Sequence, residues 1–279
     1  MQKMNRNIYF VLTLLVLASC GEYQKVLNKG TIEEQYKMAV KMYEAKKYSK
    51  ALRLFEKVTP AYRNKPQMER IQYMVANSNF NEKNYSIAGY YFNRFSQNYP
   101  KSSKKEEADF LSALSYYKAA PVYSKDPTDT NKAIESFQSF IDAYPDSPRL
   151  SEANKYYNEL QYKLETKAFE IAKGYYRTAQ TDPRNYRAAI TAFDNLLTDY
   201  LGTRYKEEAL YLRFKAAHDL AVKSKVRRKE ERIKNALKAY EKLKRNFPET
   251  KYGKETEGMV STLNTEQDKL KQLIVNSKS

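Results

Sequence analysis

A short motif recurs five times along the chain and constrains its fold more than any other feature. Each copy places a small residue four positions before an aromatic ring. The copies are Ala51/Phe55, Ala88/Phe92, Ala133/Phe137, Ala189/Phe193 and Ala236/Tyr240. Residues four apart lie on one face of an α-helix, so the alanine lets a neighbouring helix approach and the ring fills the space beside it. The motif predicts a stack of helices that repeat one packing arrangement.

Proline marks the end of the repeated helix in three of the copies. Pro100, Pro145 and Pro248 each follow the small residue by twelve positions, and a Ser or Thr stands two residues later. Proline after a helix cannot continue it, and a hydroxyl can cap the next helix. Ser147 is therefore expected to be the cap of a helix that begins at Pro148.

The spacing resembles the tetratricopeptide repeat, a helix–turn–helix unit of about 34 residues. Only 7 Gly and 9 Pro occur in 279 residues, so no strand is required. The expected fold is all-α, an α-solenoid of about five irregular tetratricopeptide helix pairs. Units one to three occupy 31–147, and units four and five occupy 148–279 with a capping helix. The expected helices span 31–46, 48–60, 67–82, 85–99, 104–119, 130–144, 148–180, 184–200, 204–224, 229–246 and 251–274. Whether 148–180 is one helix or two is left open.

The N-terminus has the pattern of an export signal. Lys3 and Arg6 precede an apolar run that is shorter than the roughly 20 residues of a membrane span. Leu17-Ala18-Ser19-Cys20 resembles the bacterial lipobox, which implies a signal peptide at 1–19, lipidation of Cys20 and an anchor linker at 20–30. Gly21 after the cysteine resembles lipoproteins of the outer membrane, on the periplasmic face. An ordinary signal peptide or a buried N-terminal helix is the alternative.

The anchor, the length and the irregular repeats together resemble the YfiO family, lipoproteins of the outer-membrane β-barrel assembly (BAM) machine. The segments that resemble those of this family are Glu207–Leu212, Tyr144–Ser147, Tyr175-Tyr176 and Tyr186–Ala189. The resemblance implies a non-enzymatic scaffold. Its partners would be unfolded outer-membrane proteins at the first repeats and the periplasmic domains of the barrel-forming subunit at the last. A repeat lipoprotein that organises peptidoglycan enzymes or secretion machinery is the alternative.

Aromatic residues recur on the first helix of each early unit, which lines the groove of tetratricopeptide proteins. Tyrosine is large, amphipathic and low in rotamer entropy, which suits recognition. The hypothesis is a substrate groove with two cations for a terminal carboxylate. Its residues are Tyr36, Tyr43, Arg70, Tyr73, Phe80, Phe110, Tyr117 and Lys118. The alternative is that these rings only pack in the core.

Positive charge is concentrated toward the C-terminus. Lys and Arg number 50 against 33 Asp and Glu, a net charge of +17. The cluster expected to bind a partner lies in a long turn and consists of Lys223, Lys225, Arg227, Arg228 and Lys229. A solvated face or an anionic lipid contact is the alternative. Nucleic acid would also suit this charge, but the export signal argues against it.

Residues for catalysis or metal binding are scarce. The chain has one Cys and one His, too few for a Cys- or His-rich metal cluster, and a serine–histidine–aspartate site would depend on that single His. His218 is expected on a helix surface or in the groove. Ser115 and Lys118 match a bare Ser-x-x-Lys without its companion motifs. The sequence therefore predicts no enzyme, no cofactor and no metal.

Overall fold

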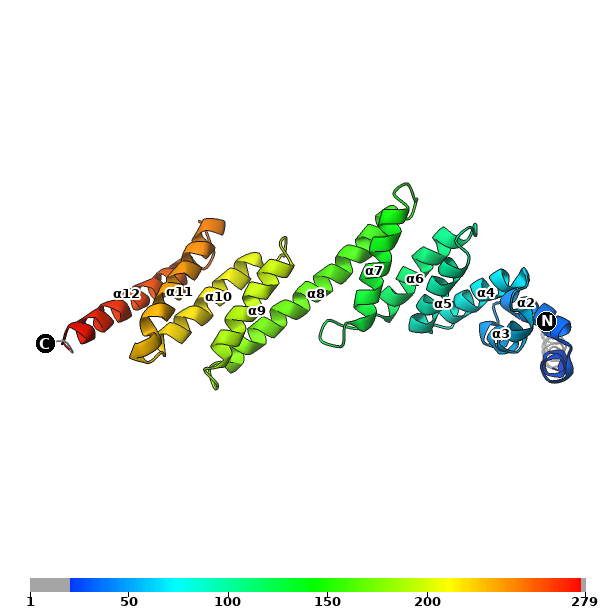
Figure 1. Cartoon of the computed structure of the whole chain (residues 1–279), viewed down its shortest axis with the longest axis horizontal. Helices are drawn as coiled ribbons and strands as arrows, with labels where there is room; N and C mark the ends of the chain where they lie inside the picture. The colour runs from blue at the N-terminus through cyan, green and yellow to red at the C-terminus, as the bar shows by residue number, and fades with distance from the viewer. Residues whose placement is uncertain (1–20, 277–279) are drawn as a thin grey trace, which may run out of the picture. The chain divides into compact units, whose positions relative to one another are not determined.

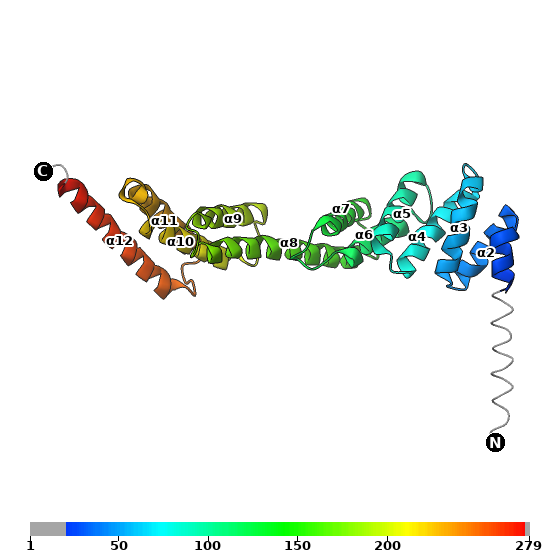
Figure 2. The same cartoon turned by 90° about the horizontal axis from the view of Figure 1, so that it is seen from below.

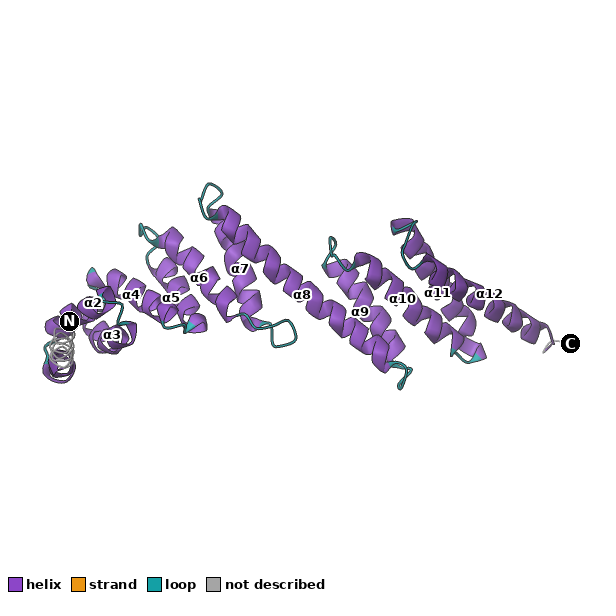
Figure 3. Ribbon diagram, turned by 180° about the vertical axis from the view of Figure 1, so that it is seen from behind, coloured by secondary structure: helices purple, strands orange, loops and turns teal. Residues whose placement is uncertain are grey.

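The computed structural model describes residues 21–276, and every regular element in this range is an α-helix (Figure 3). The expected all-α fold of tetratricopeptide-like helix pairs is confirmed. Figure 1 shows the order of the helices along the chain. Their bounds are α2 (Ile32–Glu44), α3 (Tyr48–Tyr62), α4 (Gln67–Asn81), α5 (Tyr85–Asn98), α6 (Lys105–Ala119), α7 (Thr128–Ala143), α8 (Leu150–Thr178), α9 (Asn185–Asp199), α10 (Lys206–Val222), α11 (Val226–Asn246) and α12 (Gly253–Asn276).

The repeated motif forms the core as its spacing predicts. All five small residues of the motif are completely buried, and so are the phenylalanines of the first four copies. In the fifth copy Tyr240 is half-buried, and its ring centroid lies 5.5 Å from that of Phe214. Fully burying a large apolar side chain stabilises a fold by about 1.5–3 kcal/mol. The five motifs therefore supply one packed layer of core for each helix pair.

The hydroxyl residues after the prolines do not cap the next helix, contrary to the prediction for Ser147. α8 begins at Leu150, three residues later. Ser147 Oγ instead accepts the backbone N–H of Arg149 at 3.1 Å and donates to Glu106 Oε1 at 2.7 Å. Thr250 donates in the same way to Glu207 Oε1 at 2.7 Å. Each hydroxyl thus ties its turn to the first helix of the preceding pair, where the carboxylate also favours the helix dipole.

The segment 20–30, expected to be a linker, is helical from residue 21 to residue 29. Figure 2 shows this helix beside α2 and α3. Tyr23 and Leu27 lie four residues apart on one face and are 4% and 8% exposed. Lys57 Nζ donates to the carbonyl of Leu27 at 2.9 Å, which satisfies one of the free carbonyls at the end of the helix. Burial of this apolar pair against the first helix pair explains why the segment is ordered.

The described chain forms two compact units. Unit 1 comprises the residues up to Pro121 together with Asp126–Leu160, and unit 2 comprises Val122–Lys125 together with the residues from Gln161 onward. The expected boundary at 147/148 therefore moves into α8, which is a single helix. The first half of α8 buries Leu160 in a core with α7, and its second half buries Phe169 in a core with α9.

Candidate functional site

Three of the tyrosines predicted to line a groove connect the first helices of successive pairs in unit 1. Tyr43 OH of α2 accepts a hydrogen bond from the Asn77 amide of α4. Tyr73 of α4 is hydrogen-bonded to Glu107 of α6. Tyr117 OH of α6 donates to Glu159 Oε2 of α8 at 2.6 Å. The hydroxyls therefore hold neighbouring repeats together, while the three side chains remain half-buried.

The environment keeps these phenols protonated. Burial raises the pKa of Tyr73, and the carboxylate of Glu107 raises it further. Burial and the carboxylate of Glu159 raise the pKa of Tyr117 to about 12. Burial alone would raise the pKa of Glu107, but hydrogen bonds from Lys104 and Tyr73 outweigh it and lower the pKa. Both tyrosines are therefore hydrogen-bond donors at neutral pH, Tyr73 to Glu107 and Tyr117 to Glu159.

The other aromatic residues of the predicted groove divide into two kinds. Tyr36 and Phe80 are half-buried, with ring centroids 4.9 Å from Tyr62 and 5.6 Å from Tyr85. Phe110 is only 3% exposed and belongs to the core between α6 and α7. The prediction that Phe110 contacts a substrate is therefore wrong, because its ring faces the neighbouring helix of its own pair.

The two cations predicted for this groove are exposed. Arg70 Nη2 lies 3.4 Å from Glu44 Oε1, with both side chains more than half exposed. Lys118 Nζ lies 5.8 Å from the ring centroid of Tyr85. Exposed pairs of this kind contribute little to stability, so both cations are available to a ligand.

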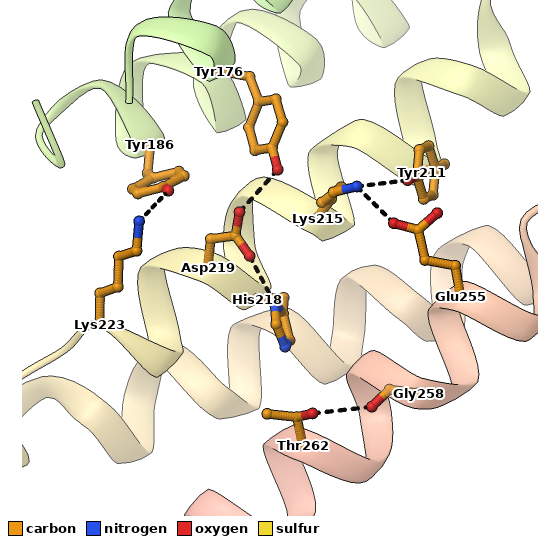
Figure 4. A network of polar contacts seen from close by, with 10 residues as sticks. All are labelled: Tyr176, Tyr186, Tyr211, Lys215, His218, Asp219, Lys223, Glu255, Gly258 and Thr262. Atoms are coloured by element: carbon orange, nitrogen blue, oxygen red, sulfur yellow. Dashed lines mark hydrogen bonds and ion pairs between the residues drawn. The ribbon is translucent and has the colours of Figure 1, made fainter. Parts of the chain in front are cut away.

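A polar network in unit 2 joins α8 to α10, and it was not among the expected site residues (Figure 4). Asp219 Oδ2 accepts from Tyr176 OH at 2.8 Å, and Asp219 Oδ1 lies 2.9 Å from His218 Nδ1. Burial would raise the pKa of Asp219, but the hydrogen bonds from His218 and Tyr176 outweigh it and lower the pKa. The 43-residue separation of Tyr176 and Asp219 equals that of Glu207 and Thr250, so the repeat period was the signal that could have found this pair.

A second part of the network joins α10 to α12. Lys215 Nζ donates to Glu255 Oε1 at 2.6 Å and to Tyr211 OH at 3.0 Å. His218, expected on a helix surface or in the groove, is only 14% exposed at its side chain, and its Nε2 is buried without a hydrogen-bond partner in the described structure. The network therefore connects the first helices of unit 2, as the tyrosines do in unit 1.

The predicted basic turn is shorter than expected because α11 begins at Val226. Arg227, Arg228 and Lys229 therefore lie in the first turn of a helix, where the dipole favours acids and opposes cations. Lys229 Nζ pairs with Glu266 Oε2 at 2.5 Å, and both side chains are less than one-fifth exposed. This pair fixes α11 to α12 and removes Lys229 from the accessible charge.

Three cations of the basic cluster are accessible. Lys223 is exposed but donates to Tyr186 OH at 2.8 Å. Lys225, Arg227 and Arg228 are exposed, and the structure of residues 21–276 pairs none of them with a carboxylate. The cluster thus presents uncompensated positive charge at the start of α11.

Two open grooves lie between the second helices of successive pairs. One has α3 and α5 as walls and α4 as floor, and its volume is about 1280 Å³. The other has α9 and α11 as walls and α10 as floor, and its volume is about 580 Å³. Neither lies on the face that carries Tyr43, Tyr73 and Tyr117.

Comparison with known proteins places this architecture in a family. The model of the YfiO family, described as an outer membrane lipoprotein, matches residues 28–232. The chain belongs to the YfiO family. The matched range of this YfiO chain ends inside α11, so most of α11 and all of α12 lie beyond it.

Two curated proteins are similar to this YfiO chain. The "Outer membrane protein assembly factor BamD" of Rickettsia prowazekii (strain Madrid E) is 26% identical over 199 residues, which cover 71% of this chain and 77% of that protein. The "Putative outer membrane protein assembly factor BamD" of Aquifex aeolicus (strain VF5) is 28% identical over 130 residues, which cover 44% and 41%. A solved structure from the computational design of self-assembling cyclic homooligomers aligns over 98% of this chain and 99% of its own, at 15% identity. Its TM-score of 0.22 supports no argument about fold.

Several features of the YfiO chain bear on anchoring and chemistry. The signal peptide at 1–19 and Cys20 lie outside the described residues. In the range 21–276, no helix has the length and hydropathy needed to cross a membrane, and no three His, Cys, Asp or Glu side chains are grouped to hold a metal. Ser115 is buried in α6 and donates to the carbonyl of Leu111.

Proposed function

We propose that this chain is a non-enzymatic assembly factor for outer-membrane β-barrel proteins, held at the periplasmic face of the outer membrane by a lipid on Cys20. Membership of the YfiO family over residues 28–232 is the observation that carries the proposal. Both similar curated proteins are named as assembly factors of this kind. The lipobox-like sequence that ends at Cys20 supports the anchor. Several acyl chains together would make that anchor stable.

The first-helix face of unit 1 is the proposed contact for unfolded outer-membrane proteins. Tyr36, Tyr43, Tyr73, Phe80 and Tyr117 place half-buried rings along α2, α4 and α6. Such rings offer apolar contact, and tyrosine adds a polar group at its edge. The exposed cations Arg70 and Lys118 lie on the same helices and suit a terminal carboxylate. Phe110 has no part in this contact, since its side chain is in the core.

The proposed contact for the barrel-forming subunit is the accessible part of the basic cluster in unit 2. Cations in the first turn of α11 oppose the helix dipole, at a cost of about 0.3–1 kcal/mol each. Stability therefore does not explain why Arg227 and Arg228 stand there. Replacing both with glutamate is expected to weaken co-purification of the subunit in low salt, where exposed charges are least screened. Unchanged co-purification in low salt would show that the cluster is only a solvated face.

Photocrosslinking in intact cells tests the substrate contact. A crosslinking amino acid at Tyr36 or Tyr73 should label nascent barrel proteins. The matched control is Tyr90, a tyrosine of the second helix α5 that is 51% exposed. Equal labelling from Tyr90, or no labelling from the first-helix face, would show that this face is not the substrate contact.

A further inference from the structure

The groove between α9 and α11 is strongly basic. It has a volume of about 580 Å³, and Glu231 is the single acid among its lining residues. Its cations come from all three helices and are Arg187, Arg213, Arg228, Arg232, Lys238 and Lys242. Only Arg228 belongs to the basic cluster at the start of α11. The other five cations of the groove are therefore additional to that cluster.

The charges follow one face of α11. Arg228, Arg232, Lys238 and Lys242 line the groove at spacings of four, six and four residues, which bring them to one side of the helix. From the first to the last, α11 rises by ~21 Å at 1.5 Å per residue. The floor, α10, contributes Arg213, Ala217 and Leu220 to the lining, so a short apolar stretch lies beside the charges of α11.

Most of this charge has no internal partner. Arg213 is neutralised, since its Nη2 lies 3.1 Å from Asp194 Oδ2. Arg232 Nη1 donates to the neutral hydroxyl of Ser224 at 2.6 Å. In the described range, no ion pair joins a carboxylate to the remaining cations of the groove, Arg187, Arg228, Lys238 and Lys242. Like charges so close together repel each other unless an anion lies between them.

We propose that this groove binds an extended acidic segment of a partner protein, with carboxylates at alternate positions and apolar side chains between them. A stretch of ~21 Å accommodates about six residues of extended chain at 3.3 Å each. Side chains of an extended peptide point alternately to opposite sides, so its carboxylates would face the cations of α11 and its apolar side chains would face the floor.

The distribution of the cations distinguishes this ligand from other anions. A phosphate or lipid headgroup needs several donors that converge on one point, whereas these cations are spread along the helix. Single-stranded nucleic acid is bound by basic grooves in which bases stack on aromatic side chains. Aromatic side chains are absent from the lining of this groove. The linear charge along α11 and the apolar contact offered by Ala217 and Leu220 favour a peptide.

The site extends beyond the proposed function, because it does not depend on which protein supplies the segment. Lys238 and Lys242 also lie beyond residue 232, where the match to the family ends. Binding of a synthetic peptide to the purified protein tests the groove alone. The photocrosslinking experiment tests the proposed assembly function. A negative result in either experiment therefore does not contradict the hypothesis tested by the other.

The test measures binding of a fluorescent seven-residue peptide, with Glu at alternate positions and Val or Leu between, to the full chain purified in detergent. The double variant Lys238→Gln/Lys242→Gln removes two cations of the groove. The matched control Lys234→Gln/Arg245→Gln removes two exposed cations of the same helix that do not line it. Two lost pairs are expected to reduce affinity about five- to tenfold in the groove variant, with no comparable loss in the control.

Two further arms complete the test. The first arm uses a peptide with Gln in place of Glu and the unmodified chain. Its affinity should be no higher than that of the acidic peptide for the groove variant, because the carboxylates are the recognised groups. Equal weakening in both double variants would mean general attraction to a basic surface and would overturn the proposal. Displacement of the peptide by millimolar inorganic phosphate would indicate a site for phosphate groups and would also overturn it. No binding of the acidic peptide to the unmodified chain has the same consequence.

Discussion

Gly89 shows at the scale of one residue how closely the repeats pack. It lies inside α5, and a β-carbon built there would come within 2.8 Å of the ring of Tyr116 on α6. Ser112 Oγ of α6 also donates to the carbonyl of Gly89 at 2.9 Å. Glycine is unfavourable in a helix interior by about 1 kcal/mol relative to alanine. The close approach of α6 therefore explains why this position lacks a side chain.

Gly89→Ala is expected to destabilise unit 1 although it raises helix propensity. Overpacking costs about 1–3 kcal/mol, which exceeds the gain in propensity, and thermal unfolding would show a lower midpoint. Gly258→Ala on α12 is the matched control, since nothing lies within 4 Å of a β-carbon there. That change should stabilise the chain by roughly 0.4–1 kcal/mol. A rise in midpoint for both variants would mean that α5 and α6 are less closely packed than described.

At the scale of the helix, unit 2 depends on carboxylates that bridge its first helices. Hydrogen bonds from Lys215 and Tyr211 lower the pKa of Glu255, which joins α12 to α10. The hydrogen bonds from His218 and Tyr176 lower the pKa of Asp219 in the same way. A carboxyl whose pKa is lower in the folded state stabilises the fold above its ordinary pKa of about 4. This stabilisation is lost as the pH falls through the folded pKa.

Thermal unfolding of unit 2 should therefore become easier as the pH falls below about 4. Asp219→Asn removes one titrating group and keeps its shape, so the variant should be less stable at pH 7 but should lose less stability on acidification. Glu257→Gln, which changes an exposed carboxyl on α12 outside the network, is the matched control. Parallel profiles for Asp219→Asn and the unmodified chain would show that Asp219 is not ionised preferentially in the folded state.

At the scale of the whole molecule, the N-terminal helix determines where a lipid anchor would act. Cys20 directly precedes the helix at 21–29, which packs against the first pair through Tyr23 and Leu27. Tyr23 OH also donates to the carbonyl of Lys50 on α3 at 3.2 Å. A lipid on Cys20 would therefore hold the first pair beside the membrane without a long flexible connection.

Cys20→Ser is expected to release the chain from the membrane and to leave the precursor uncleaved at this position, since the proposed lipid would be attached to the thiol. Fractionation of cells and mass spectrometry of the N-terminus measure both effects. The thermal midpoint of residues 21–276 should not change, which separates loss of the anchor from loss of the fold. A Cys20→Ser protein that is still membrane-bound and carries no lipid would exclude the anchor.

The sequence alone determined where the helices are. Ala133 and Phe137 four residues apart fix one face of α7, and Pro145 fixes its end, because these are local consequences of helix geometry. Each helix from α2 to α12 was expected near its observed position. The exception is the helix at 21–29, whose order depends on burial of Tyr23 and Leu27 against helices further along the chain.

The tertiary structure alone decided which side chains meet across the repeats. Turns of unequal length shift the spacing, so that Tyr43 reaches Asn77 after 34 residues but Tyr117 reaches Glu159 after 42. No local pattern gives those partners, nor the burial of Phe110. The basic groove has the same origin in part: Arg187 and Arg213 meet the cations of α11 only because α9 and α11 flank α10. Helix formation depends on neighbours in the chain, whereas the surfaces of this protein depend on how successive repeats stack.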